Sequence, residues 1–214
     1  MADKRLADIR REYSLKELTR ASVSDDPFSQ FALWMDEALA AELPEGTAMT
    51  LSTNGLDGTP SSRVVLLKGY DATGFVFFTN YESRKGQEID ADPRASLNFF
   101  WPHLERQVNI RGSITKTARE ESEAYFASRP FESRIGAVAS NQSSTLASRQ
   151  DLESRADELT KIYKDKDVPT PENWGGFRLA PAQFEFWQGR PSRLHDRIVY
   201  RLIGDEWQIS RLAP

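Results

Sequence analysis

Hydrophobic residues recur at helical spacing early in the chain. Asp25-Asp26-Pro27 supplies a helix cap followed by a proline suited to the first helical position. The apolar positions that follow are Phe28, Phe31, Trp34, Met35, Ala38 and Leu39. They predict a helix with one apolar face that ends near Leu43-Pro44.

From Thr47 onward the hydrophobic period changes to that of β-strands. The first two strands are expected to form a hairpin across Asn54–Gly58. A turn signal at Asp71–Gly74 then adds a third strand and makes a meander. The predicted strands are Thr47–Thr53, Thr59–Lys68, Phe75–Thr79, Arg94–Trp101, Leu104–Lys116, Gly176–Leu179 with Gln183–Gln188, Arg193–Leu202 and Glu206–Leu212.

Helical patterns interrupt these strands in the middle of the chain. The predicted segments are Glu82–Ala91, a helix capped by Thr117 and ended by Arg129-Pro130, Ile135–Ala139 and Leu146–Tyr163. Asn141–Ser144 forms a polar break between the last two. Antiparallel strands with a helical insertion suggest a mainly β fold, a closed barrel with helices packed outside. A parallel sheet is disfavoured because strands and helices do not alternate.

The composition is that of one soluble domain without cysteine. At 214 residues, 39% hydrophobic and 28% charged, the chain fits one domain over residues 25–214, preceded by an arm or lid over residues 1–24. The lack of Cys removes disulfides, thiolate nucleophiles and Cys-ligated metals. No apolar run could span a membrane, and the charged start does not resemble a signal peptide. We therefore expect a cytoplasmic protein.

Charge and motif content exclude several functions. The formal net charge of −4 argues against a general nucleic-acid binder. His103 and His195 are the only histidines, and there is no helical His pair or Asp-rich loop, so no metal site is expected. Glycine-rich nucleotide-binding loops and a Gly-x-Ser-x-Gly elbow are absent from the sequence, which excludes nucleotide-fold enzymes and serine hydrolases of those kinds.

The basic run Arg193–Arg197 is the sharpest candidate for chemistry. If it is a strand, Arg193, His195 and Arg197 share one face. Three neighbouring cationic groups repel one another, so an anionic or electron-rich ligand would supply the missing partner. The alternative is a basic strand edge that resists aggregation.

A second basic region runs from Arg63 to Gly86. Cations bracket the apolar run Arg63–Lys68, and Ser83–Gly86 follows the next strand, which would suit a phosphate on an apolar floor. The alternative is a core hairpin with solvated cations. Arg63 and Lys68 are an odd number of residues apart, so either a bulge intervenes or the two contact different groups.

Polar residues elsewhere add to these candidates. Tyr125, Arg129 and Ser133 are spaced by four, so a continuous helix would place them on one face, although Pro130 argues against continuity. Together they could bind a phosphate dianion, or they could be ordinary surface residues. Gln107 shares a predicted strand face with Glu105, Asn109 and Arg111, and Trp187-Gln188 adds a flat ring and an amide.

With these segments in view, the chain strongly resembles the pyridoxine/pyridoxamine 5′-phosphate oxidase family. The resemblance runs from Arg10-Arg11-Glu12-Tyr13 to the C-terminus. Its most specific pieces are Arg63–Lys68, Leu104–Val108, Gln142–Ser144 and Phe186–Gly189 leading into Arg193–Arg197. The resemblance implies a split β-barrel homodimer with FMN at the subunit interface.

The resemblance also implies roles for individual residues. FMN would contact Arg63, Val64, Val65, Leu66, Leu67, Lys68, Phe78, Thr79, Arg84, Lys85, Gln107, Gln142, Ser143, Trp187 and Arg197. The substrate would contact Arg10, Arg11, Glu12, Tyr13, Lys68, Tyr125, Arg129, Ser133, Arg193, Leu194 and His195, of which Arg193 and His195 are the implied catalytic residues. Position 78 is Phe where similar proteins often carry Tyr, and backbone contact is expected there.

The implied reaction oxidises pyridoxine 5′-phosphate or pyridoxamine 5′-phosphate at C4′ to pyridoxal 5′-phosphate. O2 is reduced to hydrogen peroxide, and the amine substrate also releases ammonia. A cation such as Arg197 would stabilise negative charge on the reduced flavin. The main alternative is another split-barrel FMN oxidoreductase such as a flavin reductase. A non-catalytic barrel that binds nucleic acid or haem is a third possibility.

Overall fold

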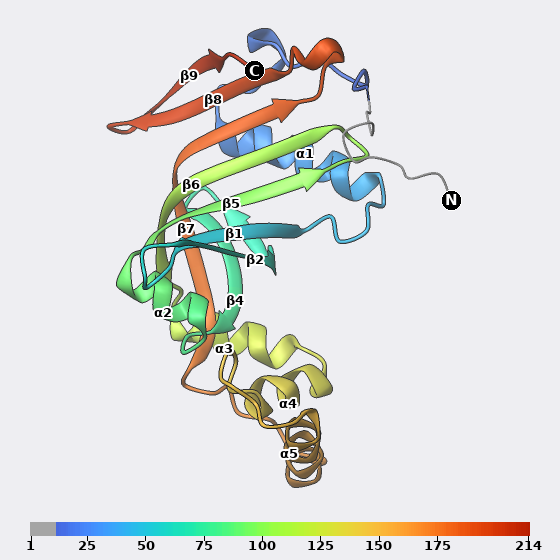
Figure 1. Cartoon of the computed structure of the whole chain (residues 1–214), viewed down its shortest axis with the longest axis vertical. Coiled ribbons are helices and arrows are strands. Elements are labelled where there is room, and N and C mark those ends of the chain that lie inside the picture. Colours follow the sequence, from blue (N-terminus) through green and yellow to red (C-terminus); the bar gives the residue numbers. More distant parts are fainter. Residues whose placement is uncertain (1–11) are drawn as a thin grey trace. The chain divides into compact units, whose positions relative to one another are not determined.

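The computed structural model describes residues 12–214, and most of its regular structure is antiparallel β-sheet (Figure 1). The strands are β1 (Ala48–Asn54), β2 (Pro60–Leu66), β3 (Gly69–Asp71), β4 (Gly74–Asn80), β5 (Arg94–Trp101), β6 (Arg106–Lys116), β7 (Trp174–Gln188), β8 (Asp196–Ile203) and β9 (Glu206–Leu212). The helices are α1 (Pro27–Ala40), α2 (Arg84–Ala91), α3 (Arg119–Ser128), α4 (Phe131–Ala139) and α5 (Arg149–Ile162). Short 3-10 turns lie at Arg20–Ser22 and Pro191–Arg193.

The mainly β, antiparallel prediction is confirmed, and the strands pair in the order β2-β1-β5-β6-β7-β4-β3. Strand β8 pairs with β7 and with β9. Among the described residues, the first and last strands of this order do not pair with each other, so the sheet has free edges. The closed barrel expected from the sequence is therefore an open, split one. β5 and β9 have the predicted bounds, and α1 begins at Pro27 behind the predicted Asp26 cap.

The predicted meander is wrong. β4 pairs with the short strand β3 on one side and with β7 on the other, whereas β2 pairs with β1. The reason is that β4 is buried on both faces and therefore requires an interior position in the sheet. Phe77 of β4 lies opposite Phe177 of β7, with ring centroids 5.7 Å apart.

Several element boundaries also differ from the sequence expectations. β7 is one continuous strand through Pro181, because extended backbone accommodates the fixed φ of proline. Helix α1 ends at Ala40 rather than near Leu43. The N-cap of α3 is Ala118, and Thr117 instead contacts the Ser122 hydroxyl at 3.0 Å.

The described chain forms two compact units. The first comprises the chain up to Met49 with Leu97–Arg111 and Ala182–Pro214. Its core is aromatic, because α1 sets Phe31 against Phe99 at 5.2 Å and Trp34 against Phe186 at 5.3 Å between ring centroids. Phe31 and Phe99 are tilted and Trp34 and Phe186 meet edge to face, and aromatic pairs of this kind add to the free energy gained from burial.

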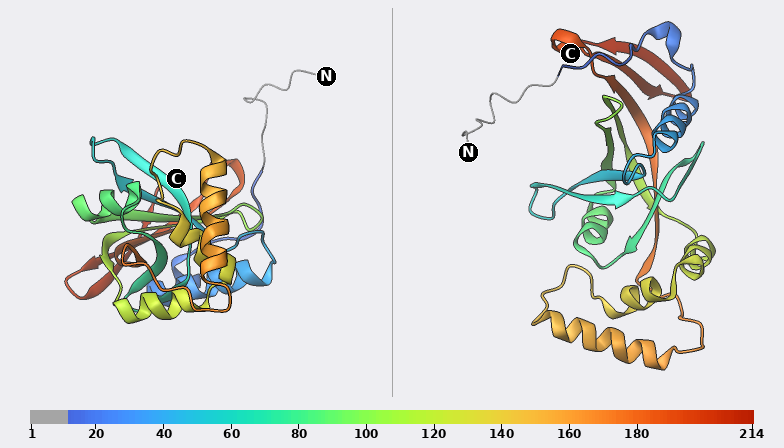
Figure 2. Two further views of the ribbon diagram at one scale, coloured as in Figure 1. Left: turned by 90° about the horizontal axis from the view of Figure 1, so that it is seen from below. Right: turned by 90° about the vertical axis from the view of Figure 1, so that its right-hand side faces the viewer.

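The second unit comprises Thr50–Ser96 and Gly112–Pro181. Its helices α3, α4 and α5 follow one another along the chain, and α4 and α5 lie side by side (Figure 2). A cluster of Phe126, Ile135, Val168 and Trp174 forms their common core. The break between α3 and α4 falls at Arg129-Pro130, as predicted.

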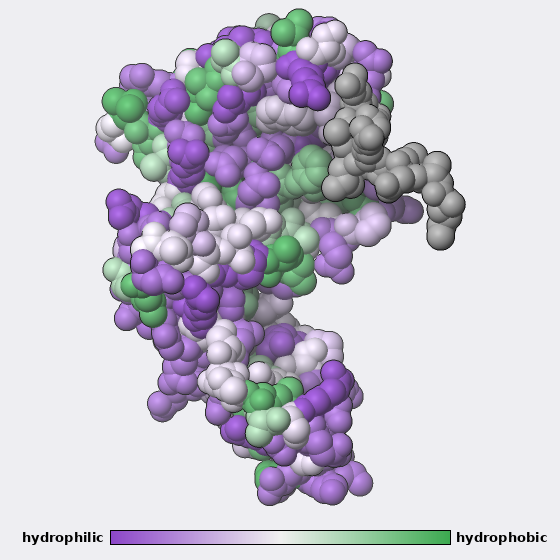
Figure 3. All heavy atoms as spheres, viewed as in Figure 1, coloured by the Kyte–Doolittle hydropathy of each residue, from purple (hydrophilic) through white to green (hydrophobic). Residues whose placement is uncertain are grey.

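No helix within residues 12–214 is long and apolar enough to cross a membrane. The face of the molecule drawn in Figure 3 is largely hydrophilic, with separate small hydrophobic patches. The hydrophobic residues on that face are therefore scattered rather than gathered into one band.

We expect Asp26→Ala to lower the free energy of unfolding by about 1 kcal/mol, because the Asp26 carboxylate accepts a hydrogen bond from the Ser29 N–H at 2.8 Å and caps α1. Urea unfolding measures the change. Asp36→Ala is the matched control, since Asp36 is exposed within the same helix. Equal losses in the two variants would contradict the capping role of Asp26.

Candidate functional site

A cavity of about 760 Å³ lies within the second unit. Cations, amides and hydroxyls share its wall with aromatic and aliphatic side chains. Its lining residues are Val64, Val65, Leu66, Lys68, Phe78, Thr79, Asn80, Lys85, Tyr125, Arg129, Pro130, Ser133, Gly136, Ala137, Ser140, Gln142 and Trp174. Mixed linings of this kind are typical of sites that take a flat organic molecule with a charged group. We call this the pocket.

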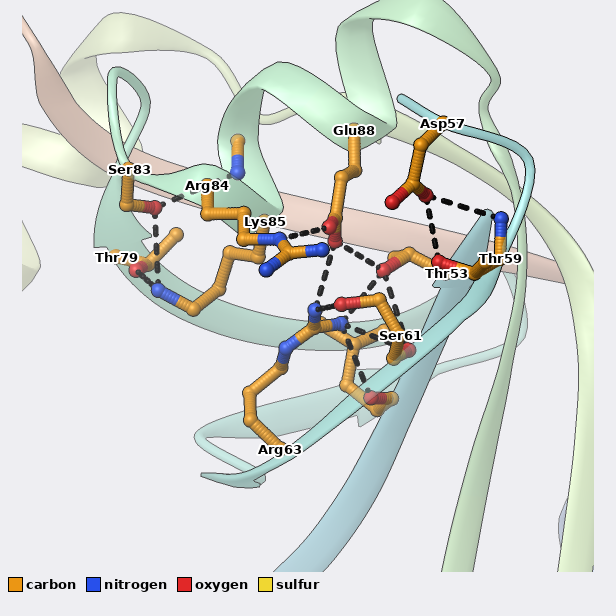
Figure 4. Close-up of polar contacts among 12 residues, drawn as sticks. Thr53, Asp57, Thr59, Ser61, Arg63, Thr79, Ser83, Arg84, Lys85 and Glu88 are labelled. Atoms are coloured by element: carbon orange, nitrogen blue, oxygen red, sulfur yellow. Dashed lines mark hydrogen bonds and ion pairs between the residues drawn. The ribbon is translucent and has the colours of Figure 1, made fainter. Parts of the chain in front are cut away.

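Lys85 is one cation of the pocket and is held by neutral acceptors. Its Nζ donates to Gln142 Oε1 at 2.6 Å, to Thr79 Oγ1 at 3.0 Å and to Ser83 Oγ at 3.1 Å. Figure 4 shows Lys85 reaching Thr79 from the start of α2. Burial, together with the charge of Arg63, lowers the pKa of Lys85 to about 8.

Arg63 and Arg84 meet at a buried carboxylate. Glu88 Oε2 accepts from Arg63 Nη2 at 2.7 Å, and Oε1 accepts from Arg84 Nε at 2.9 Å (Figure 4). Strand β2 ends at Leu66, so strand alternation does not extend to Lys68. Of the two explanations for the odd spacing of Arg63 and Lys68, a bulge or contact with different groups, the second is confirmed. Arg63 pairs with Glu88, whereas Lys68 lines the pocket.

Tyr125, Arg129 and Ser133 all line the pocket, although the chain breaks between α3 and α4. Tyr125 stacks on Phe78 with ring centroids 4.0 Å apart. The Phe78 side chain therefore belongs to the pocket wall, where only backbone contact was expected.

Arg129 lies over the aromatic wall and has an unsatisfied donor. Its guanidinium carbon is 4.9 Å from the centroid of the Trp174 ring and 5.6 Å from that of Phe126. Its Nη1 is buried without a hydrogen-bond partner in the described part of the chain. Burial lowers the pKa of Arg129, and nearby Tyr125 opposes that shift. A buried cationic donor without an acceptor indicates a place for an anion.

A second group of predicted residues lies in the first unit. The ring of His195 is 4.7 Å from Trp187 and 5.9 Å from Tyr13, measured between centroids. His195 Nδ1 accepts a hydrogen bond from the Arg190 N–H at 3.1 Å. A neutral imidazole would therefore carry its proton on Nε2.

The prediction that Arg193, His195 and Arg197 share a strand face is wrong. Arg193 lies in a 3-10 turn with φ 61°, and β8 begins only at Asp196. Arg197 is in β8, where its Nε donates to Glu185 at 2.8 Å and its Nη1 to the Ala213 carbonyl at 2.9 Å. Local turn geometry, rather than strand alternation, therefore determines where Arg193 lies.

Two carboxylates hold the segment that follows Tyr13. Glu105 accepts from the Ser14 and Leu15 N–H groups at 2.8 and 3.0 Å, and Asp196 accepts from the Leu18 N–H at 3.0 Å. Arg10 and Arg11 lie outside the described residues. Glu105 itself has φ 56° and precedes β6, so it does not share a strand face with Gln107 as predicted.

The remaining predicted residues are divided between the two units and differ in exposure. Gln107 is half-buried in β6 of the first unit, and Leu194 is 70% exposed. In the second unit Leu67 is buried and Ser143 is exposed, with φ 74°. Glu12 is exposed.

Glu88 and Glu105 are site-forming residues that our sequence reasoning missed. The four-residue spacing of Arg84 and Glu88 was the available signal for the first, since such pairs meet on a helix. No sequence pattern marked Glu105, because its carboxylate accepts hydrogen bonds from the backbone N–H groups of Ser14 and Leu15, which are about 90 residues away in sequence.

Comparison with known proteins identifies the family. Residues 35–163 match the sequence profile of pyridoxamine 5′-phosphate oxidase, and residues 174–214 match a pyridoxine 5′-phosphate oxidase C-terminal dimerisation region. The chain belongs to the pyridoxamine 5′-phosphate oxidase family. FMN is accordingly its cofactor, and its fold is the FMN-binding split barrel of that family.

Individual relatives support this assignment. The pyridoxine/pyridoxamine 5′-phosphate oxidase of Trichormus variabilis is 53% identical over 99% of this chain and all of its own. That of Burkholderia lata is 57% identical over 98% of this chain and 99% of its own.

Solved structures include PhzG of Burkholderia lata in complex with tetrahydrophenazine-1-carboxylic acid, at TM-score 0.88 and 30% identity over 94% of this chain and all of its own. An FMN-binding protein of Nostoc punctiforme, at TM-score 0.70 and 16% identity over 90% of this chain and all of its own, shares the fold.

Lys85 is one of the residues that we expect to contact FMN. If it contacts the phosphate, the affinity for FMN should fall as the pH rises through about 8, the pKa of Lys85, because the ammonium becomes neutral while the phosphate remains a dianion. The negative charge of Glu88 raises the pKa of Lys85, whereas the positive charge of Arg63 lowers it. Fluorescence titration with FMN at several pH values measures the slope. Lys85→Arg should flatten it, since a guanidinium stays charged. The same slope in both proteins would show that another group titrates.

Proposed function

We propose that the protein oxidises pyridoxine 5′-phosphate and pyridoxamine 5′-phosphate to pyridoxal 5′-phosphate. The alcohol loses two electrons and two protons, which reduce O2 to hydrogen peroxide. The amine loses the same electrons and protons, and hydrolysis of the resulting imine by one water releases ammonia. The high identity to curated relatives that carry these substrate names supports the proposal.

The observation that carries the substrate assignment is the buried, unpartnered Nη1 of Arg129 in the pocket. A phosphate oxygen would supply the acceptor that this donor lacks, and charge-assisted bonds of this type are the strong ones. The hydroxyls of Tyr125 and Ser133 line the same pocket, as does Lys68. We assign the substrate phosphate to these four residues.

The residues present also fit FMN. Lys85 and Arg84 offer cations to the cofactor phosphate, with Thr79 and Gln142 beside Lys85. The strand Val64–Leu66 offers apolar side chains and backbone to a ring. The chemistry supplied by bound FMN is acceptance of an electron pair from the substrate and its transfer to O2.

The protein's own contribution is to bind and orient. We assign Arg193 and His195 to the pyridine ring of the substrate, with Arg10 and Tyr13 closing over it. Trp187 and Arg197 are assigned to the cofactor. The T-shaped contact of Tyr13 with Trp187, at 5.8 Å between centroids, supports a common role for these residues. Fixed orientation of reacting groups lowers the barrier by reducing the entropy lost on reaction.

We further propose a homodimer with FMN at the subunit interface and a cytoplasmic location. The match of residues 174–214 to a dimerisation region supports the dimer.

PhzG provides a second candidate activity, oxidation of a reduced tricyclic carboxylic acid, because its fold matches at TM-score 0.88. Its 30% identity is well below the 53–57% of the oxidases above. Arg129, Tyr125 and Ser133 favour a phosphate over a carboxylate, since they provide a cation and two hydroxyls for several acceptor oxygens. An FMN reductase that uses a nicotinamide is the remaining alternative.

The direct test is to mix the FMN-loaded protein aerobically with pyridoxine 5′-phosphate and with pyridoxamine 5′-phosphate. We expect pyridoxal 5′-phosphate and hydrogen peroxide to appear in equal amounts, with ammonia only from the amine. Tetrahydrophenazine-1-carboxylic acid and reduced nicotinamides serve as competing substrates. Faster turnover of either competitor would reject the proposed substrate.

We expect Arg129→Ala to raise the KM for pyridoxine 5′-phosphate about tenfold to a hundredfold, because one charge-assisted hydrogen bond is worth roughly 1.5–3 kcal/mol. FMN retention should change little. Steady-state kinetics and flavin absorbance measure the two effects. Arg155→Ala, at an exposed position of α5, is the control. Loss of FMN with an unchanged KM would mean that Arg129 serves the cofactor instead.

A further inference from the structure

The side chain of Glu88 is fully buried although it is an acid. It lies at the centre of the polar group drawn in Figure 4 and accepts hydrogen bonds from three elements. Arg63 of β2 donates to Oε2 at 2.7 Å, Thr53 of β1 donates to the same oxygen at 2.6 Å, and Arg84 of α2 donates to Oε1 at 2.9 Å. A carboxylate this buried is tolerated only when it is paired and hydrogen-bonded.

The guanidinium groups of Arg63 and Arg84 differ in how many hydrogen-bond donors remain free for a ligand. Arg63 uses both terminal nitrogens on Glu88, Thr53 and Ser61, so it is fixed. Arg84 is 61% exposed, and within the described residues it donates only through Nε. Its two terminal nitrogens remain available to a ligand, in the fork geometry that suits phosphate.

Lys85 follows Arg84 directly and belongs to the same electrostatic group. The charge of Arg63 lowers the pKa of Lys85, whereas the charge of Glu88 raises it. Three cations and one carboxylate leave a net charge of two positive. This charge matches a phosphate monoester, which is close to a dianion at neutral pH.

We propose that Glu88 is a positioning residue for the phosphate of FMN, which holds Arg63 and Arg84 in place beside Lys85. The inference rests on the proposed function, because it assigns these cations to the cofactor phosphate. Without Glu88, Arg63 and Arg84 would lose their common anchor and repel each other. Lys85 would also lose a neighbouring negative charge that raises its pKa. The site would then have to be ordered at the moment of binding, which lowers affinity.

Comparison of FMN with riboflavin isolates the phosphate, because the two differ only in that group. The full-length chain, freed of flavin, is titrated with each and the loss of flavin fluorescence is followed. We expect the wild type to prefer FMN. Glu88→Gln should lower the affinity for FMN about tenfold, as expected for loss of a charge-assisted anchor, and leave that for riboflavin unchanged. Glu153→Gln, which removes another Arg–Glu pair at the same helical spacing, should behave like the wild type.

Four results would overturn the inference. Equal losses of FMN and riboflavin in Glu88→Gln would show that Glu88 only supports the fold. Tighter FMN binding would show that it acts only as a repelling charge. An unchanged preference for FMN would show that it has no part in phosphate binding. A wild type without any preference for FMN would reject the proposed site itself and this inference with it.

Thr53→Val provides a second test if Glu88→Gln does not fold. The substitution keeps the side-chain volume and removes a hydroxyl that bonds to both Glu88 and Arg63. We expect a smaller loss of affinity for FMN and none for riboflavin. A Thr53→Val protein that keeps the full preference for FMN would contradict the role given to this network.

Discussion

Repulsion between like charges is the constraint around which the cations in and beside the pocket are arranged. Arg63, Arg84 and Lys85 lie close together, and gathering three cations costs free energy; burial first, and then the charge of Arg63, lowers the pKa of Lys85. The protein offsets that cost in two ways: Glu88 neutralises the guanidinium pair, and neutral oxygens of Thr79, Ser83 and Gln142 surround the ammonium. The cations are thus ordered before any ligand arrives, which reduces the entropy lost on binding.

Arg129 differs from these cations in having aromatic rather than polar neighbours. No carboxylate pairs with it among the described residues, and it packs on the faces of Trp174 and Phe126 instead. Aromatic faces attract a cation without occupying its donors. A buried donor therefore remains for an incoming anion. The cations around Glu88 are therefore balanced by a carboxylate, whereas Arg129 in the pocket is not.

Much of this arrangement could be predicted from the sequence. Hydrophobic alternation located the strands, and the spacing of Tyr125, Arg129 and Ser133 anticipated residues that share the pocket. Alternation failed at Arg193, because a turn with positive φ replaces the start of the strand. The strand order could not be predicted, because β4 pairs with β7, which lies about a hundred residues further along the chain. The one available signal was the almost continuous apolar run of β4, which is buried on both faces and so lies inside the sheet.

Glu88 illustrates a further limit. A lone acid in a short helix is usually solvated, and its burial depends on β1 and β2 meeting α2. The resemblance to a known family pointed to cations that bind ligands, but not to the residue that keeps those cations together.

The position of Trp174 gives the protein an optical property. Its indole lines the pocket and is nearly parallel to the rings of Phe78 and Tyr125, with interplanar angles of 13° and 7°. Indole emission overlaps the absorption of oxidised flavin, so energy transfer would dim this residue whenever a flavin occupies the pocket. Reduced flavin absorbs less in that range. With FMN bound in this pocket, the emission of Trp174 would report both the occupancy and the redox state of the cofactor from within the chain.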